Sequence, residues 1–376
     1  MIEERERERE ELKTTKQSIS PFSLANTKQI YHNSFSFAFH QTLFKMAVPL
    51  LLSIVLVFSL TSFSAESRLS TTYYSRKCPR FQQIVLDTIT NKQITSPTTA
   101  AGTLRLFFHD CMIEGCDASV LISSNSFNTA ERDADINHSL PGDAFDVVVR
   151  AKIALELECP GIVSCSDILA LATRDLVTMV GGPFYQVYLG RKDGFISKAT
   201  NVEGKLPKST MGMNEIINLF TAKGFSIQEM VALSGAHTIG FSHCKEFANR
   251  LFNYSKYSSV DPTLNPRYAD GLKRACANYK SNPEISTFND LMTPNKFDNK
   301  YYQNLPRGLG LLATDRAMIE DLRTRPFALK YAYNQTVFFE DFARAMQKLS
   351  LVGVKQGRWG EIRRRCDAFN YIKTSN

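Results

Sequence analysis

The chain has 376 residues, of which 43% are hydrophobic and 22% charged, the balance of an ordinary globular protein. Its formal net charge is +8, but no block of Lys and Arg with interleaved aromatic residues occurs, so we expect no nucleic-acid partner. Moderate basicity is compatible with attraction to acidic polysaccharide, although a solvated basic surface is the simpler interpretation.

The N-terminus has two parts before the main body of the chain. Residues 1–45 form an unusual extension, in which acidic and basic side chains alternate between Glu3 and Glu11. Residues 46–65 carry no charge, and within them an apolar run of about 15 residues, 46–60, is followed by a short segment that ends in Ser64 and Ala65. This run is too short for a membrane span of about 20 residues and has the form of a signal peptide. We favour a translation start at Met46, which would leave the extension untranslated; retention of the run as a membrane anchor is the alternative. Residues 66–376 are expected to form one domain.

The body of the chain shows helical patterns joined by loops. Apolar residues at i, i+3 and i+4 predict helices within residues 82–90, 147–157, 166–180 and 338–349. Ser226 and Glu229 have capping-box spacing, and Gly235 closes the helix that they begin, with His237 at its C-terminal end. Alternating strand patterns are short and few, so the fold class is mainly α.

All eight cysteines lie between Cys78 and Cys366, after the apolar run. An even number in this position predicts four disulfides and an oxidising compartment, whereas reduced and buried thiols are the alternative. The spacing by itself leaves the pairing open.

Residues 104–111 combine several kinds of chemistry. In a helix, Arg105 and His109 stand at i and i+4 on one face, so a fixed cation lies beside a titratable base. Asp110 is rotated by about 100° from His109 and is free for another partner. Taken alone, the histidine is more typical of a core residue and the arginine of a surface charge.

These residues taken together indicate a protein family. Arg105-x-x-x-His109-Asp110-Cys111, followed by Gly-Cys-Asp-x-Ser, resembles the distal motif of the class III plant secretory haem peroxidases, and residues 233–240 around His237 are similar to their proximal motif. The likeness extends over roughly residues 70–367. It implies a two-lobed fold with one haem b between a distal and a proximal lobe. It also implies a monomer that is secreted to the cell wall or apoplast, or is vacuolar.

The same resemblance implies the chemistry. Hydrogen peroxide is reduced through an oxo-ferryl intermediate, and small phenolic donors are oxidised in one-electron steps. On the distal side, the resemblance makes His109 the proton acceptor, Arg105 the transition-state stabiliser, and Asn137, six residues after Glu131, the hydrogen-bond partner of His109. On the proximal side it makes His237 the axial iron ligand and Asp315 the carboxylate that bonds to His237. Pro207 is the implied contact for the donor. Taken alone, Asp315 and Leu206-Pro207 would be expected in turns.

Two calcium ions are also implied by the resemblance. The first set is Asp110, Ile113, Gly115, Asp117, Ser119 and Glu131, and the second is Thr238, Asp290, Thr293, Lys296 and Asp298. Oxygen-rich sets of this kind suit calcium, although charged surface turns are the simpler interpretation. The implied disulfides are Cys78 with Cys159, Cys111 with Cys116, Cys165 with Cys366, and Cys244 with Cys276, and Asp167 with Arg191 is implied as a structural ion pair.

Some features depart from the family pattern. Met112-Ile113 replaces an aromatic residue and a valine, and Asn289 stands where an apolar residue would pack against His237. The one tryptophan, Trp359, is far from the proximal motif, unlike in ascorbate and cytochrome c peroxidases.

Two further points stay open. Of three glycosylation sequons, at Asn137, Asn253 and Asn334, the first should stay unmodified if Asn137 lines the pocket. The alternative function is a non-catalytic secreted haem- or calcium-binding wall protein, which would need neither Arg105 nor His109.

Overall fold

The structure, a computed structural model, describes residues 69–370. The proposed extension (residues 1–45) and signal peptide (46–65) lie outside the described residues, as does the choice between a start at Met46 and a membrane anchor. Among the helices of residues 69–370, none combines the length and the apolar character needed to cross a bilayer.

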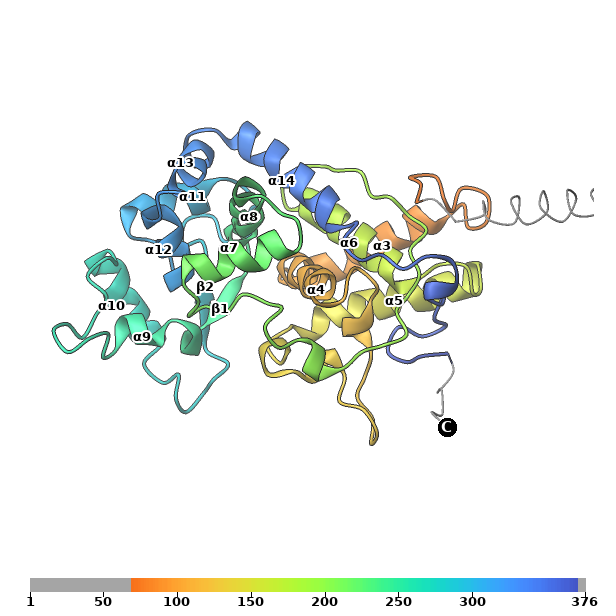
Figure 1. Ribbon diagram of the computed structural model, residues 1–376, viewed down its shortest axis with the longest axis horizontal. Coiled ribbons are helices and arrows are strands. Elements are labelled where there is room, and N and C mark those ends of the chain that lie inside the picture. The colour runs from red at the N-terminus through yellow and green to blue at the C-terminus, as the bar shows by residue number, and fades with distance from the viewer. Residues whose placement is uncertain (1–68, 371–376) are drawn as a thin grey trace, which may run out of the picture. The chain divides into compact units, whose positions relative to one another are not determined.

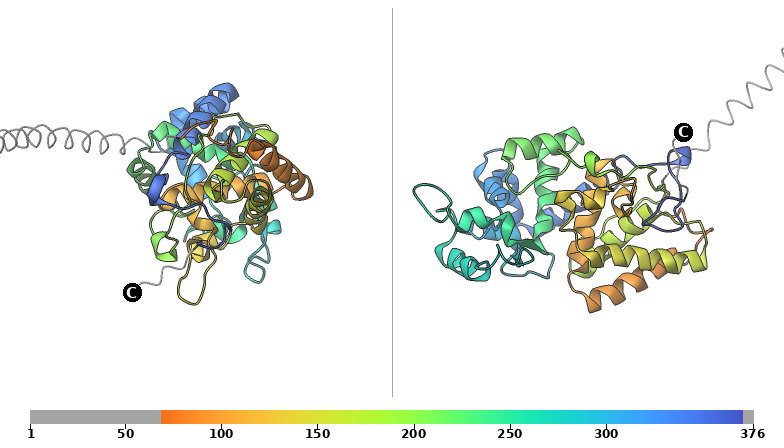
Figure 2. Two further views of the ribbon diagram at one scale, coloured as in Figure 1. Left: turned by 90° about the vertical axis from the view of Figure 1, so that its right-hand side faces the viewer. Right: turned by 90° about the horizontal axis from the view of Figure 1, so that it is seen from below.

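The described unit is built almost wholly of helices, arranged in two lobes (Figures 1 and 2). The distal lobe contains α3 (Phe81–Thr95), α4 (Thr99–Ile113), α5 (Gly142–Glu158) and α6 (Cys165–Met179). The proximal lobe contains α7 (Met213–Ala222), α8 (Ile227–Ser234), α9 (Ala248–Leu251), α10 (Pro266–Ala275), α11 (Lys300–Asn304), α12 (Ala313–Glu320) and α13 (Arg325–Tyr333). Helix α14 (Gln335–Leu349) packs on α8 and runs from the proximal lobe toward the distal one.

Strands are nearly absent from residues 69–370, as expected. β1 (Phe241–His243) and β2 (Ser286–Phe288) form one antiparallel pair with Phe241 opposite Phe288. The mainly α fold class is therefore confirmed.

Each helix predicted from periodicity is present, and most extend beyond the predicted range. α3, α5 and α14 continue past residues 82–90, 147–157 and 338–349, because periodicity detects the buried stripe and not the ends of a helix. Polar caps set several starts. The hydroxyl of Ser164 accepts the Asp167 N–H, and Ser226 and Glu229 form the predicted capping box.

Four disulfides link the described residues in the pairing that the resemblance implies. Cys165–Cys366 joins residues 201 apart and fastens the C-terminal segment to the start of α6. The Asp167–Arg191 ion pair is also present, with Arg191 Nη1 2.9 Å from Asp167 Oδ1 and both side chains fully buried. Removing one partner would leave an uncompensated buried charge, so this pair is structural.

Candidate active site

Helix α4 presents the first half of the site. It packs against α5 and α6, and most of its residues are buried, as its mainly apolar sequence requires. Arg105 and His109 lie one turn apart on this helix, as predicted. His109 is only 6% exposed, so its environment is set by protein groups and not by bulk water.

The hydrogen bonds of Asn137 fix the tautomer of His109. The Asn137 amide nitrogen donates to the Glu131 carbonyl at 2.7 Å, which turns its Oδ1 toward His109 Nδ1 at 2.6 Å. Because a side-chain carbonyl only accepts, Nδ1 must carry the hydrogen and Nε2 keeps the lone pair. His109 is therefore held as a base with its free nitrogen on the far side of the ring.

The protonation state of His109 follows from its surroundings. Burial and the positive charge of Arg105 lower its pKa, the hydrogen bond that it donates to Asn137 opposes them in part, and the net pKa is about 3. The imidazole is neutral at ordinary pH and ready to accept a proton.

The loop after Asn137 also holds Arg105. Its Nη1 donates to the Ser139 carbonyl at 2.8 Å and its Nη2 to the Ser139 hydroxyl at 2.9 Å. Burial lowers the pKa of Arg105, and the negative charge of Glu246 opposes that shift. One short loop thus orients both the base and the cation. Ser139 appeared in the sequence only as the third residue of a sequon, and Glu246 belongs to no motif.

The second half of the site follows α8. This helix ends at Ser234, with Gly235 as its C-cap, and His237 lies in the short 3-10 helix η5 (Gly235–Thr238). His237 Nδ1 lies 2.9 Å from Asp315 Oδ1, so Nδ1 donates and Nε2 is free. The His237 side chain is 38% exposed, unlike the Asp315 side chain, which is buried.

Asp315 is fixed by three donors. Besides His237, the Tyr301 hydroxyl donates to Oδ1 at 2.8 Å and the Leu312 N–H donates to Oδ2 at 3.0 Å. Burial by itself would raise the pKa of Asp315, but His237 and the other donors outweigh it and lower the pKa. The expectation of a turn is wrong for this residue, because Asp315 lies in the first turn of α12 and caps it.

Tyr301, from α11, supplies the aromatic contact to His237 that Asn289 does not. The two rings meet edge to face, with centroids 5.8 Å apart at 89°. Asn289 Oδ1 instead accepts from the Ser242 hydroxyl at 2.7 Å. The sequence placed Tyr301 beside the predicted ligand Asp298 but gave no sign of its contact with Asp315.

The two histidine segments approach each other closely. Gly240, three residues after His237, has φ +86°, and a Cβ at that position would lie 3.0 Å from the Cβ of Ala101, one turn before Arg105 on α4. The pair of glycines around His237 therefore allows the close backbone approach that the sequence predicts.

The first predicted calcium set is a buried group of oxygens. Asp110 accepts from the Ala118 N–H at 2.9 Å, and the Ser119 hydroxyl donates to Glu131 Oε2 at 2.9 Å. Glu131 Oε1 is buried, and no described residue donates to it. Burial raises the pKa values of Asp110, Asp117 and Glu131, and mutual repulsion adds to the rise for Asp110 and Glu131. A cation would relieve this repulsion.

Two lysines also lie at this first set. Lys223 Nζ donates to the Ile113 carbonyl at 2.8 Å, and Lys355 Nζ is 3.7 Å from Asp117 Oδ2. Gly115, the remaining member, has φ +120°, and a Cβ there would lie 2.6 Å from Gly353 Cα. An ion would share this site with two ammonium groups.

The second predicted set follows His237. The Thr293 hydroxyl lies 3.0 Å from Asp290 Oδ2 and 3.1 Å from Asp298 Oδ1, and the Asp298 N–H donates to the Thr238 hydroxyl at 3.4 Å. Lys296 lies in the same turn, with its N–H on the Thr293 carbonyl at 3.0 Å. The structure thus brings together the members of this set.

Neither set is a cage of acidic side chains alone. Among residues 69–370, no group of three or more His, Cys, Asp or Glu side chains is placed to hold a metal ion. Each set instead mixes carboxylates with hydroxyl and carbonyl oxygens, the mixture that calcium accepts and that transition metals bind less readily.

The remaining predicted site residue is Pro207. It is half-buried and follows Leu206, which is 2% exposed, while Ser209 two residues later donates to Glu246 Oε2 at 3.0 Å. This places Pro207 near the carboxylate that acts on Arg105.

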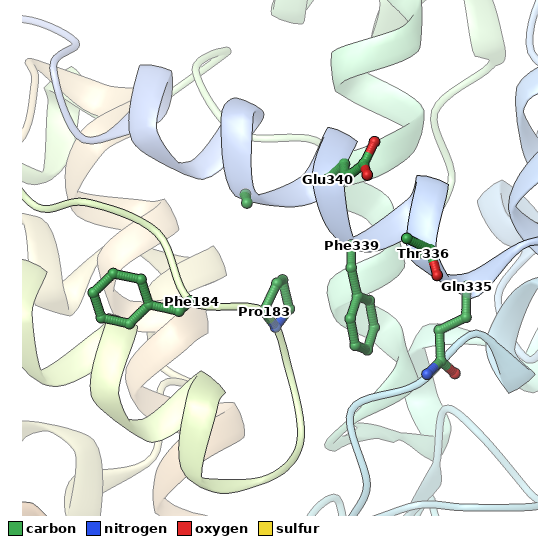
Figure 3. Close-up of a pocket in the computed structure, with 7 residues that line it drawn as sticks. Pro183, Phe184, Gln335, Thr336, Phe339 and Glu340 are labelled. Atoms are coloured by element: carbon green, nitrogen blue, oxygen red, sulfur yellow. The ribbon is translucent and has the colours of Figure 1, made fainter.

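A surface pocket of about 290 Å³ lies elsewhere, between the loop after α6 and the start of α14 (Figure 3). Its lining consists of Pro183, Phe184, Gln335, Thr336, Phe339, Glu340 and Ala343. None of these belongs to the histidine segments, so the pocket is separate from the site described above.

Comparison with known proteins gives one consistent result. A family model described as Peroxidase matches residues 85–334, the stretch that holds both histidine segments. Peroxidase 63 of Arabidopsis thaliana is 60% identical over 330 residues, which are 88% of this chain and 99% of that protein. Peroxidase 31 and Peroxidase 65 of the same plant are each 62% identical, over 82% and 81% of this chain and 96% and 90% of their own lengths.

Proposed function

Because this chain belongs to the class III plant secretory peroxidases, enzymes that use hydrogen peroxide to oxidise a reducing substrate, we propose that His109 and His237 face the two sides of its haem. One observation carries the proposal. In both histidines Nδ1 is hydrogen-bonded and Nε2 is free, but the acceptor is the amide of Asn137 for His109 and the carboxylate of Asp315 for His237. The first arrangement suits a neutral base and the second an electron-rich metal ligand.

The residues fit a haem of the b type. Within residues 69–370, the acidic or basic side chain at hydrogen-bond distance from His237 is that of Asp315, which holds Nδ1 and leaves Nε2 as the nitrogen available to the iron. A single imidazole suits an iron whose equatorial ligands come from a porphyrin, and not an iron held by protein ligands alone. When bound, the haem supplies the iron that takes peroxide as a ligand and passes the oxidising equivalents to donors.

The distal residues then handle protons and charge. We assign His109 Nε2 the role of accepting the proton from the peroxide oxygen nearer the haem and returning it to the far oxygen, which leaves as water. Arg105 stabilises the negative charge that develops on the departing oxygen, with a fork of donors that a lysine lacks. Asn137 keeps the ring of His109 oriented and its Nδ1 protonated, so Nε2 is the nitrogen that takes and returns the proton.

The finer assignments rest on the contacts around the site. We propose that calcium binds both oxygen sets, which would lock the residues next to His109 and His237. Small phenols are the proposed donors, and they would approach near Pro207. Four disulfides support an oxidising destination, the cell wall or the vacuole. The comparisons do not favour a non-catalytic haem- or calcium-binding wall protein.

The test is rapid mixing of the haem- and calcium-loaded protein with one equivalent of hydrogen peroxide, followed by absorption. The wild type should show a transient spectral change that added guaiacol reverses, and the Arg105→Leu/His109→Leu double variant should not. His243→Leu is the matched control, because it removes a histidine of β1 whose Nδ1 lies 3.3 Å from the Glu284 carbonyl and whose ring contacts that of Phe241. If the double variant bound haem and reacted as fast as the wild type, the distal assignment would be wrong.

A further inference from the structure

Glu246 is a charged residue at the site that the mechanism does not use. It ends the 3-10 helix η6 (Cys244–Glu246), which the Cys244–Cys276 disulfide and the bond from the Cys244 N–H to the Ile285 carbonyl hold in place. Its Oε2 accepts from the Ser209 hydroxyl at 3.0 Å. The carboxylate therefore has a fixed position and is not a free surface acid.

Two features connect this carboxylate with the proposed site. Ser209, its hydrogen-bond partner, is two residues after Pro207, the proposed donor contact. On the other side, the charge of Glu246 is close enough to act on the buried guanidinium of Arg105. Glu246 is thus bonded to the residue two after the proposed donor contact, and its charge acts on the proposed catalytic arginine.

We propose that Glu246 determines donor specificity, by disfavouring aromatic donors that carry a carboxylate and favouring neutral or cationic ones. The inference rests on the proposed function, because it takes Pro207 and Arg105 to mark the donor approach. It adds a residue that recognises the charge of the donor and not its aromatic ring.

The size of the effect follows from electrostatics. If the carboxylate of a bound donor lies about 8 Å from that of Glu246, at an effective dielectric constant of about 40, their repulsion lowers the rate or affinity for that donor roughly fivefold. Glu246 is half-buried, so salt screens it less than a fully exposed acid. Of the basic residues nearby, Lys208 already pairs with Glu203 at 3.3 Å, and Lys245 is exposed.

The experiment compares two donors that share one guaiacyl ring, coniferyl alcohol and ferulate. For each, kcat/KM is measured with the haem- and calcium-loaded wild type, with Glu246→Gln and with Glu203→Gln. Glu203→Gln is the matched control, because it removes an equal charge from an exposed acid near Pro207. Dividing the ferulate value by the coniferyl alcohol value for each enzyme cancels any change in the peroxide step.

We expect Glu246→Gln to raise this ratio roughly fivefold at low ionic strength and less at high salt, and Glu203→Gln to change it less than twofold. A ratio unchanged in Glu246→Gln, or raised equally by both variants, would overturn the inference. A wild type that oxidised neither donor, nor guaiacol, would overturn the proposed function itself, and this inference with it.

Discussion

His109 and His237 show how one partner atom sets the role of an imidazole. Each donates its Nδ1 hydrogen, His109 to the neutral amide of Asn137 and His237 to the carboxylate of Asp315. An amide leaves the ring a weak base that stays neutral, whereas a carboxylate increases the electron density on the free nitrogen. Two residues of the same type are therefore suited to proton transfer in one case and to metal binding in the other.

The low pKa of His109 predicts the acid limit of the reaction with peroxide. Burial and Arg105 lower the pKa to about 3. The second-order rate constant for the reaction with peroxide should therefore be constant above about pH 4 and fall only below that pH. Because the pKa is lower in the folded than in the unfolded protein, this group also makes stability fall as pH drops from about 6.5 toward 3.

The variant Asn137→Asp tests whether the pKa of His109 sets this acid limit. A carboxylate behind His109 favours the charged ring, so the acid limit should move to higher pH, as measured by stopped flow between pH 3 and 7. An acid limit already near pH 6.5 in the wild type would contradict the lowered pKa.

Replacing Asp315 tests the carboxylate behind His237. Asp315→Asn keeps the shape but removes the charge, so the rate constant with peroxide should fall about 10- to 100-fold and the midpoint potential of the iron should rise. Tyr301→Phe, which removes only the hydroxyl bonded to Asp315 Oδ1, is the control and should have a smaller effect on both quantities. Equal rates in Asp315→Asn and the wild type would remove Asp315 from the proposed site.

At the scale of elements, the interior of α4 carries the first half of the site and the end of α8 positions the second half. The capping box fixes the start of α8, and Gly235 ends it against α14 and α11, which directs His237 toward Asp315. The sequence predicted this start and end because caps are local. It gave no sign that Gly235 faces Phe338 and Tyr302, because that contact depends on how α14 and α11 pack.

Two glycine substitutions should have opposite effects on stability. In Gly235→Ala the new Cβ would lie 2.6 Å from the Tyr302 hydroxyl, so the free energy of unfolding should drop by about 1–3 kcal/mol. In Gly271→Ala, inside α10, the Cβ meets nothing within 4 Å, so the free energy should rise by about 0.5–1 kcal/mol. Denaturant unfolding measures both, and shifts in the same direction would refute the packing described at Gly235.

At the scale of the whole molecule, distant parts of the chain are fastened to α6 and its surroundings. Asp193 accepts from the N–H groups of Cys165 and Ser166 at the start of α6, and from Arg363 near the C-terminus. The Cys165–Cys366 disulfide makes the same connection covalently. The C-terminal segment therefore supports the distal lobe, although it is far from it in sequence.

Removing calcium should weaken the whole fold. Burial disfavours the ionised forms of Asp110, Asp117 and Glu131, which a bound cation would stabilise, and a calcium concentration a thousand times its Kd adds about 4 kcal/mol of stability. For a domain of this size, chelation should then lower Tm by roughly 5–10 °C, reversibly on addition of calcium.

Two variants identify the carboxylates involved. Asp117→Asn should reduce the Tm shift on chelation, and the exposed Asp270→Asn should leave it as in the wild type. Calorimetry with and without chelator measures both shifts. A wild-type Tm that does not change with chelator would rule out calcium at these sets.

The sequence by itself indicated five of the helices and the capping box of Ser226 and Glu229, because periodicity and capping are local properties of a chain, whereas the two histidine motifs and the oxygen sets came from its resemblance to a family. Only the tertiary structure decided that Ser139 holds Arg105, that Tyr301 holds Asp315 and that Glu246 acts on Arg105. These partners lie 34, 14 and 141 residues apart and belong to no motif. No local pattern encodes such pairs, since they form only when separate helices and loops pack together.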